Sequence, residues 1–232
     1  MATFVVAHGA WSAGWVWKKM HPLLRAKGHA LLAPTYTGLG ERVHLASSLI
    51  GLETHVQDML MALQFEDVKD AILIGHSYGG MVATGVAAMA ADRIAKLVYL
   101  DAFVPRHGES VLDLVTPEER ERRLAGVVDD WRLPPSPVPP DTSAEDVAWI
   151  TPRRVHQPLA CFQEPLLLNH GEPKMPRSYI YAQRHNPGDP FRQFLERAKN
   201  EGWQTFEMDA SHSPHVTAPE ALAEILDRIA RG

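Results

Sequence analysis

Short apolar runs alternate with segments of helical character along most of the chain. The runs are four or five residues long and apolar at successive positions, which is typical of strands buried on both faces in a parallel sheet. They occupy residues 3–7, 30–33, 71–74, 96–100, 178–182 and 204–208. Apolar residues at helical spacing or a high helix propensity mark residues 15–27, 56–63, 81–91 and 219–230. This alternation predicts an α/β fold with a mostly parallel sheet of about six strands flanked by helices.

The alternation stops between Pro105 and Pro176, a distance too long for an ordinary connection. Residues 118–124 and 144–150 are helix candidates, and five prolines between 134 and 140 predict a stiff link. We therefore expect a core at residues 1–105 and 176–232, with an inserted and mostly helical cap at 106–175. The apolar residues of the cap either line a substrate pocket or bury the cap against the core; they include Leu112, Leu114, Leu124, Val128, Trp131, Trp149 and Phe162.

The third apolar run leads into Gly-His-Ser-Tyr-Gly at 75–79, which matches the G-x-S-x-G pattern. A strand before the motif and a helix of small residues after it are the context that this pattern requires. On such a sharp turn the hydroxyl of Ser77 is exposed at a helix N-terminus, where developing negative charge is favoured. Ser77 is therefore the predicted nucleophile; the alternative is a chance match in a glycine-rich turn.

An oxyanion in acyl transfer needs two hydrogen-bond donors placed where the charge develops. The backbone amide of Tyr78, the residue after the nucleophile, is the first candidate. Gly9 follows the first predicted strand and allows a turn that aims the amide of Ala10 into the same space. Ala10 and Tyr78 are thus the expected oxyanion hole, although the sequence at 8–9 also fits an ordinary turn at the end of a strand.

A serine hydroxyl needs a base to accept its proton, and in this arrangement the histidine comes last along the chain. His212 follows the sixth predicted strand and is the preferred base. His215 is the competitor, but Pro214 and the approach to the final helix favour a surface or structural role for it.

These motifs resemble a family of small α/β-hydrolases that includes plant methylesterases, hydroxynitrile lyases and related bacterial esterases. The matching pieces are spread over the chain, at residues 4–11, 75–80, 99–105 and 212–214. The resemblance implies the α/β-hydrolase fold and cofactor-free ester cleavage beneath a helical cap. The lyase branch of the family usually carries threonine at the position of Gly9 and lysine at that of Ser213, so the residues present here favour hydrolysis.

The acid of the triad is less clearly marked. Members of the family usually place an aspartate just after the fifth strand, but this chain has none at the matching position, and Asp189 follows a few residues later. Asp101 ends the fourth strand, where some other α/β-hydrolases carry their acid, and we prefer it, with Asp189 as the alternative. Asp101 could instead be a structural carboxylate that caps amides, and Asp189 could cap a helix before Pro190. Asp209 lies too near His212 along the chain to orient it easily.

Composition and charge limit the kinds of partner that the protein is expected to bind. A net charge of −5 provides no basic stripe for nucleic acid, and the single cysteine, Cys161, cannot form an internal disulfide or a paired zinc site. The N-terminal residues lack the basic start and the apolar run of a signal peptide, so we expect a cytoplasmic protein without membrane contact. No cofactor or metal is expected. The sequence does not decide whether the protein forms a homodimer.

The predicted reaction is a two-step acyl transfer on small, largely apolar carboxylic esters. We expect Trp11, Trp131 and Trp149 to contact the substrate. Two alternatives remain: a hydroxynitrile lyase or other carbon–carbon cleaving enzyme of the same fold, and a receptor that binds a small ligand with an idle serine.

Overall fold

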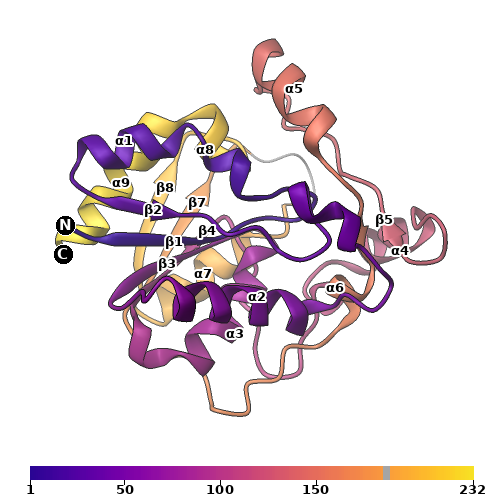
Figure 1. Ribbon diagram of the computed structural model, residues 1–232, viewed down its shortest axis with the longest axis horizontal. Coiled ribbons are helices and arrows are strands. Elements are labelled where there is room, and N and C mark those ends of the chain that lie inside the picture. The colour runs from indigo at the N-terminus through magenta and orange to yellow at the C-terminus, as the bar shows by residue number, and fades with distance from the viewer. Residues whose placement is uncertain (185–188) are drawn as a thin grey trace.

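The computed structural model describes residues 1–184 and 189–232, and a six-stranded sheet forms its centre (Figure 1). Every neighbouring pair in this sheet is parallel. The spatial order is β2-β1-β3-β4-β7-β8, formed by β1 (Thr3–Ala7), β2 (Ala30–Leu32), β3 (Ala71–His76), β4 (Ile94–Leu100), β7 (Arg177–Ala182) and β8 (Gln204–Met208). The prediction of a mostly parallel six-stranded sheet is confirmed.

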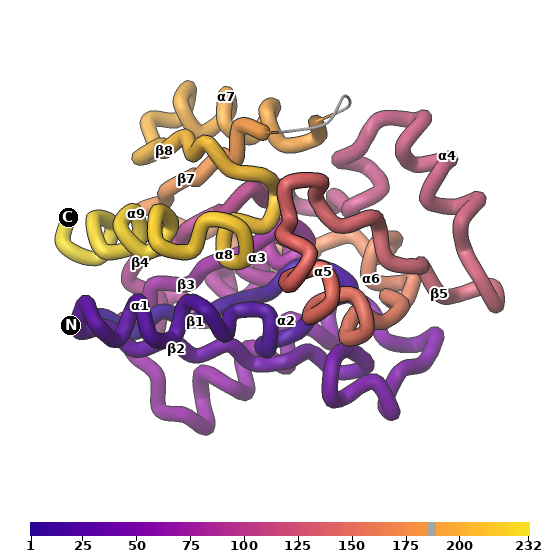
Figure 2. The backbone as a smooth tube through the Cα atoms, turned by 90° about the horizontal axis from the view of Figure 1, so that it is seen from above, coloured from indigo at the N-terminus to yellow at the C-terminus, as the bar shows by residue number. Residues whose placement is uncertain are grey.

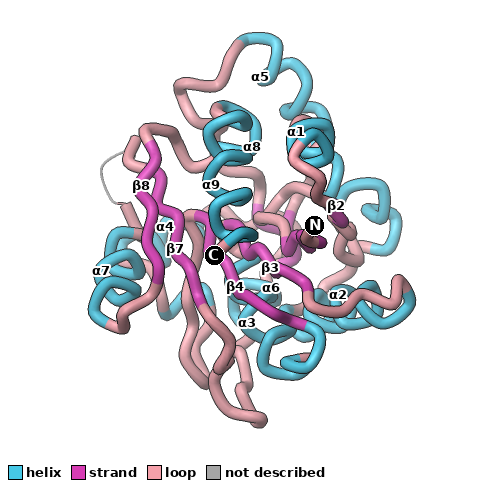
Figure 3. The backbone as a smooth tube through the Cα atoms, turned by 90° about the vertical axis from the view of Figure 1, so that its left-hand side faces the viewer, coloured by secondary structure: helices cyan, strands magenta, loops and turns pink. Residues whose placement is uncertain are grey.

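Helices cover both faces of the sheet, as Figure 3 shows from the end where the strands begin. One face carries α1 (Met20–Ala26), α8 (Pro214–Thr217) and α9 (Pro219–Arg231); the other carries α2 (Leu52–Phe65), α3 (Gly79–Met89) and α7 (Arg192–Asn200). The alternation of side chains along a strand feeds both layers. In β1, Phe4 and Val6 join the apolar cluster of α1 and α9, whereas Val5 and Ala7 join that of α2 and α3.

Several local features differ from the sequence-based expectation. The segment expected to be one helix at 15–27 is divided into a 3-10 turn, η1 (Gly14–Trp17), followed by α1. Two more 3-10 turns, η2 (Gly40–Leu45) and η3 (Ala91–Arg93), lie in connections. Within the described ranges, no helix has both the length and the apolar character that crossing a bilayer requires.

The interval between β4 and β7 holds the segment predicted as a cap. Its helices α4 (Pro117–Ala125) and α5 (Ala144–Ile150) begin where the side chains of Thr116 and Ser143 accept hydrogen bonds from backbone amides of their first turns. The remaining elements, which the sequence did not predict, are η4 (Val111–Asp113), η5 (Thr151–Arg153), α6 (Ala160–Gln163) and a small antiparallel pair, β5 (Arg132–Leu133) and β6 (Gln157–Pro158). The exact division at residues 106 and 175 stays a prediction.

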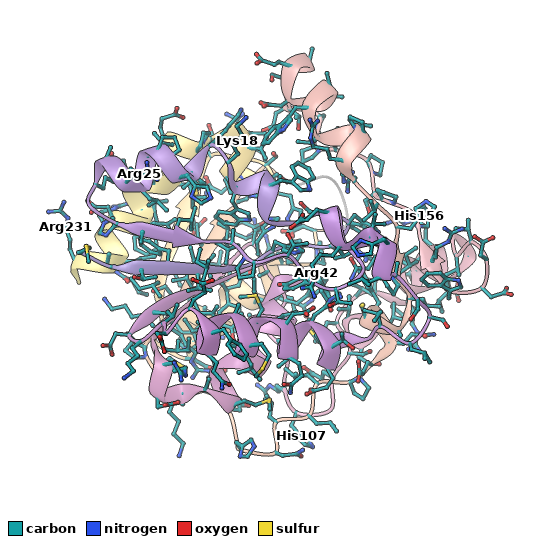
Figure 4. All side chains as sticks on the ribbon, in the orientation of Figure 1. Lys18, Arg25, Arg42, His107, His156 and Arg231 are labelled. Atoms are coloured by element: carbon teal, nitrogen blue, oxygen red, sulfur yellow. The ribbon has the colours of Figure 1, made fainter. Side chains whose placement is uncertain are left out.

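The cap elements gather at one end of the molecule, opposite both chain termini (Figures 1 and 2). In Figure 4, the labelled residues Arg25 and Arg231 lie at the end with the termini, and His156 lies in the cap. The strands of the sheet point their carboxyl ends toward the cap. Because the chain places β2 and β3 on opposite sides of β1, a crevice forms at the carboxyl ends of β1 and β3, where such sheets bind ligands.

Candidate active site

Ser77 lies on a sharp turn between β3 and α3, at the crevice. Its φ of 55° places a non-glycine residue in the left-handed region, a strained conformation that recurs at functional sites. Two glycines allow the surrounding backbone to pass this close. A Cβ on Gly79 would lie 2.0 Å from the carbonyl oxygen of Ala7, and one on Gly80 would lie 2.1 Å from that of Phe103. The turn therefore requires glycine at positions 79 and 80.

His212 follows β8 and reaches the serine through its ring. The hydroxyl of Ser77 lies 2.9 Å from Nε2 of His212, and Nδ1 of the same ring lies 2.7 Å from Oδ2 of Asp101. The ring of Phe191 stacks on the imidazole, with centroids 4.9 Å apart and planes at 9°. Because Nδ1 faces a carboxylate, it carries the proton, and Nε2 is left to accept the proton of Ser77.

Asp101 is the acid that the structure brings to the histidine. Its side chain is fully buried at the end of β4, and its φ of 44° turns the backbone sharply there. Oδ1 accepts a hydrogen bond of 3.1 Å from the amide of Ala182 in β7, which leaves Oδ2 directed at His212. Both carboxylate oxygens thus have defined donors, and the orientation of the acid is fixed from the neighbouring strand.

Asp189, the alternative acid, is engaged elsewhere. It accepts hydrogen bonds from the hydroxyl of Tyr181 and, at 2.8 Å, from the amide of Phe191. The second contact is a local turn just before α7; it is not the helix cap suggested by the sequence, because the N-cap of α7 is Phe191 and no side chain caps it. Through this contact, Asp189 supports the residue whose ring stacks on His212.

Ala10 and Tyr78, the residues expected to supply the oxyanion hole through their amides, border the same cavity as Ser77. Within the part of the chain that the structure describes, neither amide donates a hydrogen bond to a protein acceptor. Trp11, the residue after Ala10, has a φ of 58°, so the loop after β1 turns as sharply as the nucleophile turn does. Two unengaged donors beside a nucleophile are what an oxyanion requires.

A cavity of about 380 Å³ opens above these groups. Its apolar wall comes from Trp11, Phe103, Ile150, Phe162 and Phe191. Such a mixture of aromatic walls and a few convergent polar groups is typical of a site for a small molecule.

Two of the three tryptophans expected to contact substrate do not border this cavity, so that part of the prediction is corrected. Trp149 packs edge-on against Trp15, with ring centroids 5.6 Å apart. Trp131 lies under the guanidinium of Arg132, 5.5 Å from its ring centroid. Trp149 also packs against the apolar cluster of α1 and α9, whereas Trp11 does border the cavity.

Sequence reasoning missed a role for His76, the residue before the nucleophile. Its Nε2 donates a 2.8 Å hydrogen bond to the carbonyl oxygen of His212. Burial lowers the pKa of His76 to about 3, so the ring is neutral and donates through one nitrogen only. His215, the competitor for the base, is buried and stacks on Trp17 at 4.6 Å and 8°, which places it in a structural position.

No cluster of three or more potential metal ligands occurs among the described residues. The site thus consists of a serine, an imidazole, a carboxylate and two backbone donors. This set can carry out acyl transfer through a covalent intermediate.

Comparison with known proteins agrees with this arrangement. The model of the "Alpha/beta hydrolase family" matches residues 4–225. A carbendazim hydrolyzing esterase from Nocardioides sp. (strain SG-4G) is 41% identical over 97% of this chain and 98% of its own. Salicylic acid-binding protein 2 of Nicotiana tabacum is 32% identical over 103 residues, which cover 44% of this chain and 40% of that protein.

A solved structure is also similar over its full length. The extracellular alpha/beta-hydrolase from a Paenibacillus species has a TM-score of 0.86 and 25% identity, with 98% of each chain covered. Its description reports structural and functional homology to the tobacco salicylic acid-binding protein 2. The resemblance inferred from the sequence motifs is confirmed. By fold and by sequence, the chain belongs to the alpha/beta hydrolase family.

Proposed function

We propose that this protein is a serine esterase that cleaves small, largely apolar carboxylic esters through an acyl-enzyme intermediate. The observation that carries the proposal is the continuous hydrogen-bonded chain from Ser77 through His212 to Asp101, with heavy-atom distances of 2.9 and 2.7 Å. Nucleophile, base and orienting acid thereby stand in the relation that activates a serine hydroxyl.

In the acylation step, the hydroxyl oxygen of Ser77 attacks the ester carbonyl while Nε2 of His212 takes its proton. The amides of Ala10 and Tyr78 hold the oxyanion as it forms. Asp101 stabilises the imidazolium by accepting from Nδ1, and its complete burial strengthens this interaction. The imidazolium then protonates the leaving alcohol, and the acyl group stays on the serine.

Deacylation repeats these steps with water. His212 removes a proton from water, the resulting nucleophile attacks the acyl carbonyl, and the same two amides hold the second oxyanion. Collapse of this intermediate returns the proton to Ser77 and releases the carboxylic acid. The imidazole is 32% exposed, so water can approach it from the cavity.

The relative that matches nearly the whole chain supports ester cleavage over cyanohydrin cleavage. The protein with 41% identity is named as an esterase. The packing of the loop after β1 also favours ester cleavage, because a Cβ at position 9 would lie 2.8 Å from Nδ1 of His76. A threonine there, as in the lyase branch, would require this buried ring to move.

The test compares purified wild type with Ser77→Ala, and uses Ser48→Ala, an exposed serine, as the matched control. The assays are hydrolysis of p-nitrophenyl acetate, a panel of methyl esters and carbendazim, together with labelling by a fluorophosphonate probe. We expect Ser77→Ala to lose labelling and at least about a thousandfold of turnover, and Ser48→Ala to match wild type.

Three results would contradict the proposal. Full esterase activity in Ser77→Ala would remove the nucleophile. Absence of both labelling and turnover in wild type would favour a ligand-binding protein. Turnover of mandelonitrile without turnover of any ester would favour a lyase.

A further inference from the structure

The charge inside the cavity differs in sign from that of the whole protein. The chain has a net charge of −5. Among the described residues that border the cavity, however, four are arginines and two are acids; they are Arg122, Arg123, Arg154, Arg184, Glu119 and Asp189. An excess of guanidinium groups in a confined site raises the local concentration of anions.

Three of these arginines have carboxylate partners. Arg122 and Arg123 share Glu119, at 2.5 and 2.6 Å, and Arg184 pairs with Asp209 at 2.6 Å. Arg154 differs from these three because it has no carboxylate partner: within residues 1–184 and 189–232, no carboxylate lies within ion-pair distance of its guanidinium.

Arg154 is held in place by neutral groups. Nη1 donates a hydrogen bond to the carbonyl oxygen of Ser136 in the proline-rich link, and the guanidinium lies 5.7 Å from the ring centroid of Trp11. The side chain is partly buried, and burial lowers its pKa, although a guanidinium stays charged in proteins. Its remaining donors have no other protein acceptor in the described part of the chain.

We propose that Arg154 binds a carboxylate on the part of the ester that does not react. This inference rests on the esterase function proposed above and specifies its substrate class. Trp11 is adjacent in sequence to Ala10, a donor of the oxyanion hole, so Arg154 flanks the wall where the reacting carbonyl binds. A planar guanidinium with free donors matches a carboxylate in geometry and charge. The favoured substrate is therefore a half-ester, apolar around its reacting carbonyl and anionic at a distance from it.

Two rigid methyl esters of equal shape test this. Monomethyl terephthalate carries a carboxylate where methyl 4-acetylbenzoate carries a neutral acetyl group, and both release methanol. Charge-assisted hydrogen bonds predict that wild type prefers the anionic ester by roughly ten- to a hundredfold in kcat/KM. Arg154→Gln should bring this ratio close to one, mainly through KM of the anionic ester, and Arg154→Lys should keep part of the preference.

The matched control is Arg153→Gln, because Arg153 is the neighbouring arginine but is exposed and does not border the cavity. It should keep the wild-type ratio. The inference would be overturned if Arg154→Gln lowered kcat/KM equally on both esters, or if wild type did not prefer the anionic ester. Either result would leave the proposed esterase function intact. Failure of wild type to cleave any ester in the wider panel would instead count against the proposed function.

A second inference concerns the loop that carries Ala10, and it rests on different contacts. The cap holds Trp11 at three points. Its amide donates to Oε1 of Gln157 at 3.1 Å, its carbonyl accepts from the amide of Val155 at 3.2 Å, and its indole donates to the carbonyl of Leu133 at 3.0 Å. These partners lie in or beside β5 and β6, where Leu133 pairs with Gln157.

We infer that Gln157 is a positioning residue for the oxyanion hole. It is fully buried, and it supplies the only side-chain acceptor that the described residues offer to the amide of Trp11. Without that acceptor the partly buried amide would be left unpaired, and the left-handed turn at Trp11 would lose a contact that maintains it. Relaxation of this turn would move the adjacent Ala10 amide away from the developing charge.

The test replaces Gln157 by Met, which is similar in length but has no such acceptor, and by Glu, which keeps an acceptor oxygen. Gln163→Met, on the exposed side of α6, is the control. We expect Gln157→Met to lower kcat by roughly ten- to a hundredfold with KM within about threefold. The rate of fluorophosphonate labelling should fall in parallel, and Gln157→Glu should recover most of both.

A purely structural role would lower the melting temperature and leave kcat per labelled site unchanged, and this result would overturn the inference. So would equal losses in the Met and Glu variants. Should Gln157→Met fail to fold, Gln157→Asn, which withdraws the acceptor by one methylene, provides the same comparison.

Discussion

The strongest test of the site geometry is Asp101→Asn. The amide of Ala182 donates to Oδ1 of Asp101, so an asparagine must place its oxygen there to accept the same hydrogen bond. Its NH₂ group then occupies the place of Oδ2, 2.7 Å from Nδ1 of His212. Two donors cannot face each other, so the imidazole must move its proton to Nε2. In that tautomer it cannot accept the proton of Ser77.

The expected loss follows from this exchange of tautomers. In well-studied serine hydrolases the same substitution lowers kcat about ten-thousandfold, which corresponds to roughly 5 kcal/mol of transition-state stabilisation. Because Asp101 is fully buried and both its oxygens are engaged, we expect a loss of that order here. The assay is steady-state hydrolysis of p-nitrophenyl acetate, with melting temperature measured to confirm folding.

Asp189→Asn is the matched control. Its side-chain oxygen can still accept from the amide of Phe191, so kcat should stay within about tenfold of wild type. The reasoning fails if Asp101→Asn keeps more than a tenth of wild-type activity, or if Asp189→Asn is equally damaging.

Three further outcomes follow from packing and burial. Gly79→Ala should destabilise the fold by about 3 kcal/mol or more in urea unfolding, because its Cβ would lie 2.0 Å from a carbonyl oxygen of β1; near-normal stability would contradict this packing. Burial lowers the pKa of His8, His55 and His76 from 6.5 to about 3, so the stability tied to their neutral forms is present above pH 6.5 and is lost as pH falls toward 3. Keeping each of these rings neutral at pH 5.5 should cost roughly 1 kcal/mol of folding free energy, and a melting temperature unchanged from pH 8 to pH 5 would refute this. Trp149→Ala should change kcat/KM by less than about threefold on methyl esters, since the ring packs outside the cavity; a tenfold loss would place it back among the substrate contacts.

The sheet was predictable because each strand is buried on both faces and is therefore apolar at successive positions. All six strands were located within two residues of their observed ends. The pair formed by β5 and β6 was not, since each strand has only two residues and their pairing depends on the fold of the cap. The division of 15–27 into η1 and α1 likewise left no break in the hydrophobic pattern that could have revealed it.

Some residues of the site could be predicted from the sequence more easily than others. Ser77 and His212 are marked by local patterns, a glycine-flanked turn and a position after the last strand. The choice between Asp101 and Asp189 depends on which loop faces the imidazole, and no local pattern contains that information. The tryptophans show the same difficulty, because composition cannot tell whether a large ring faces the cavity, as in Trp11, or the packing of the cap, as in Trp149.

Two adjacent arginines show most clearly why the sequence alone does not reveal which side chains face the cavity. Arg153 and Arg154 are identical in sequence terms, yet one is exposed and the other points its guanidinium into the cavity beside Trp11. Only the path of the chain through η5 and β6 separates them. The same segment also anchors the oxyanion loop through Gln157, so the cap contributes both a charge for substrate recognition and a support for catalysis. Substitutions in the cap should therefore alter kcat and selectivity separately, according to whether they affect Gln157 or Arg154.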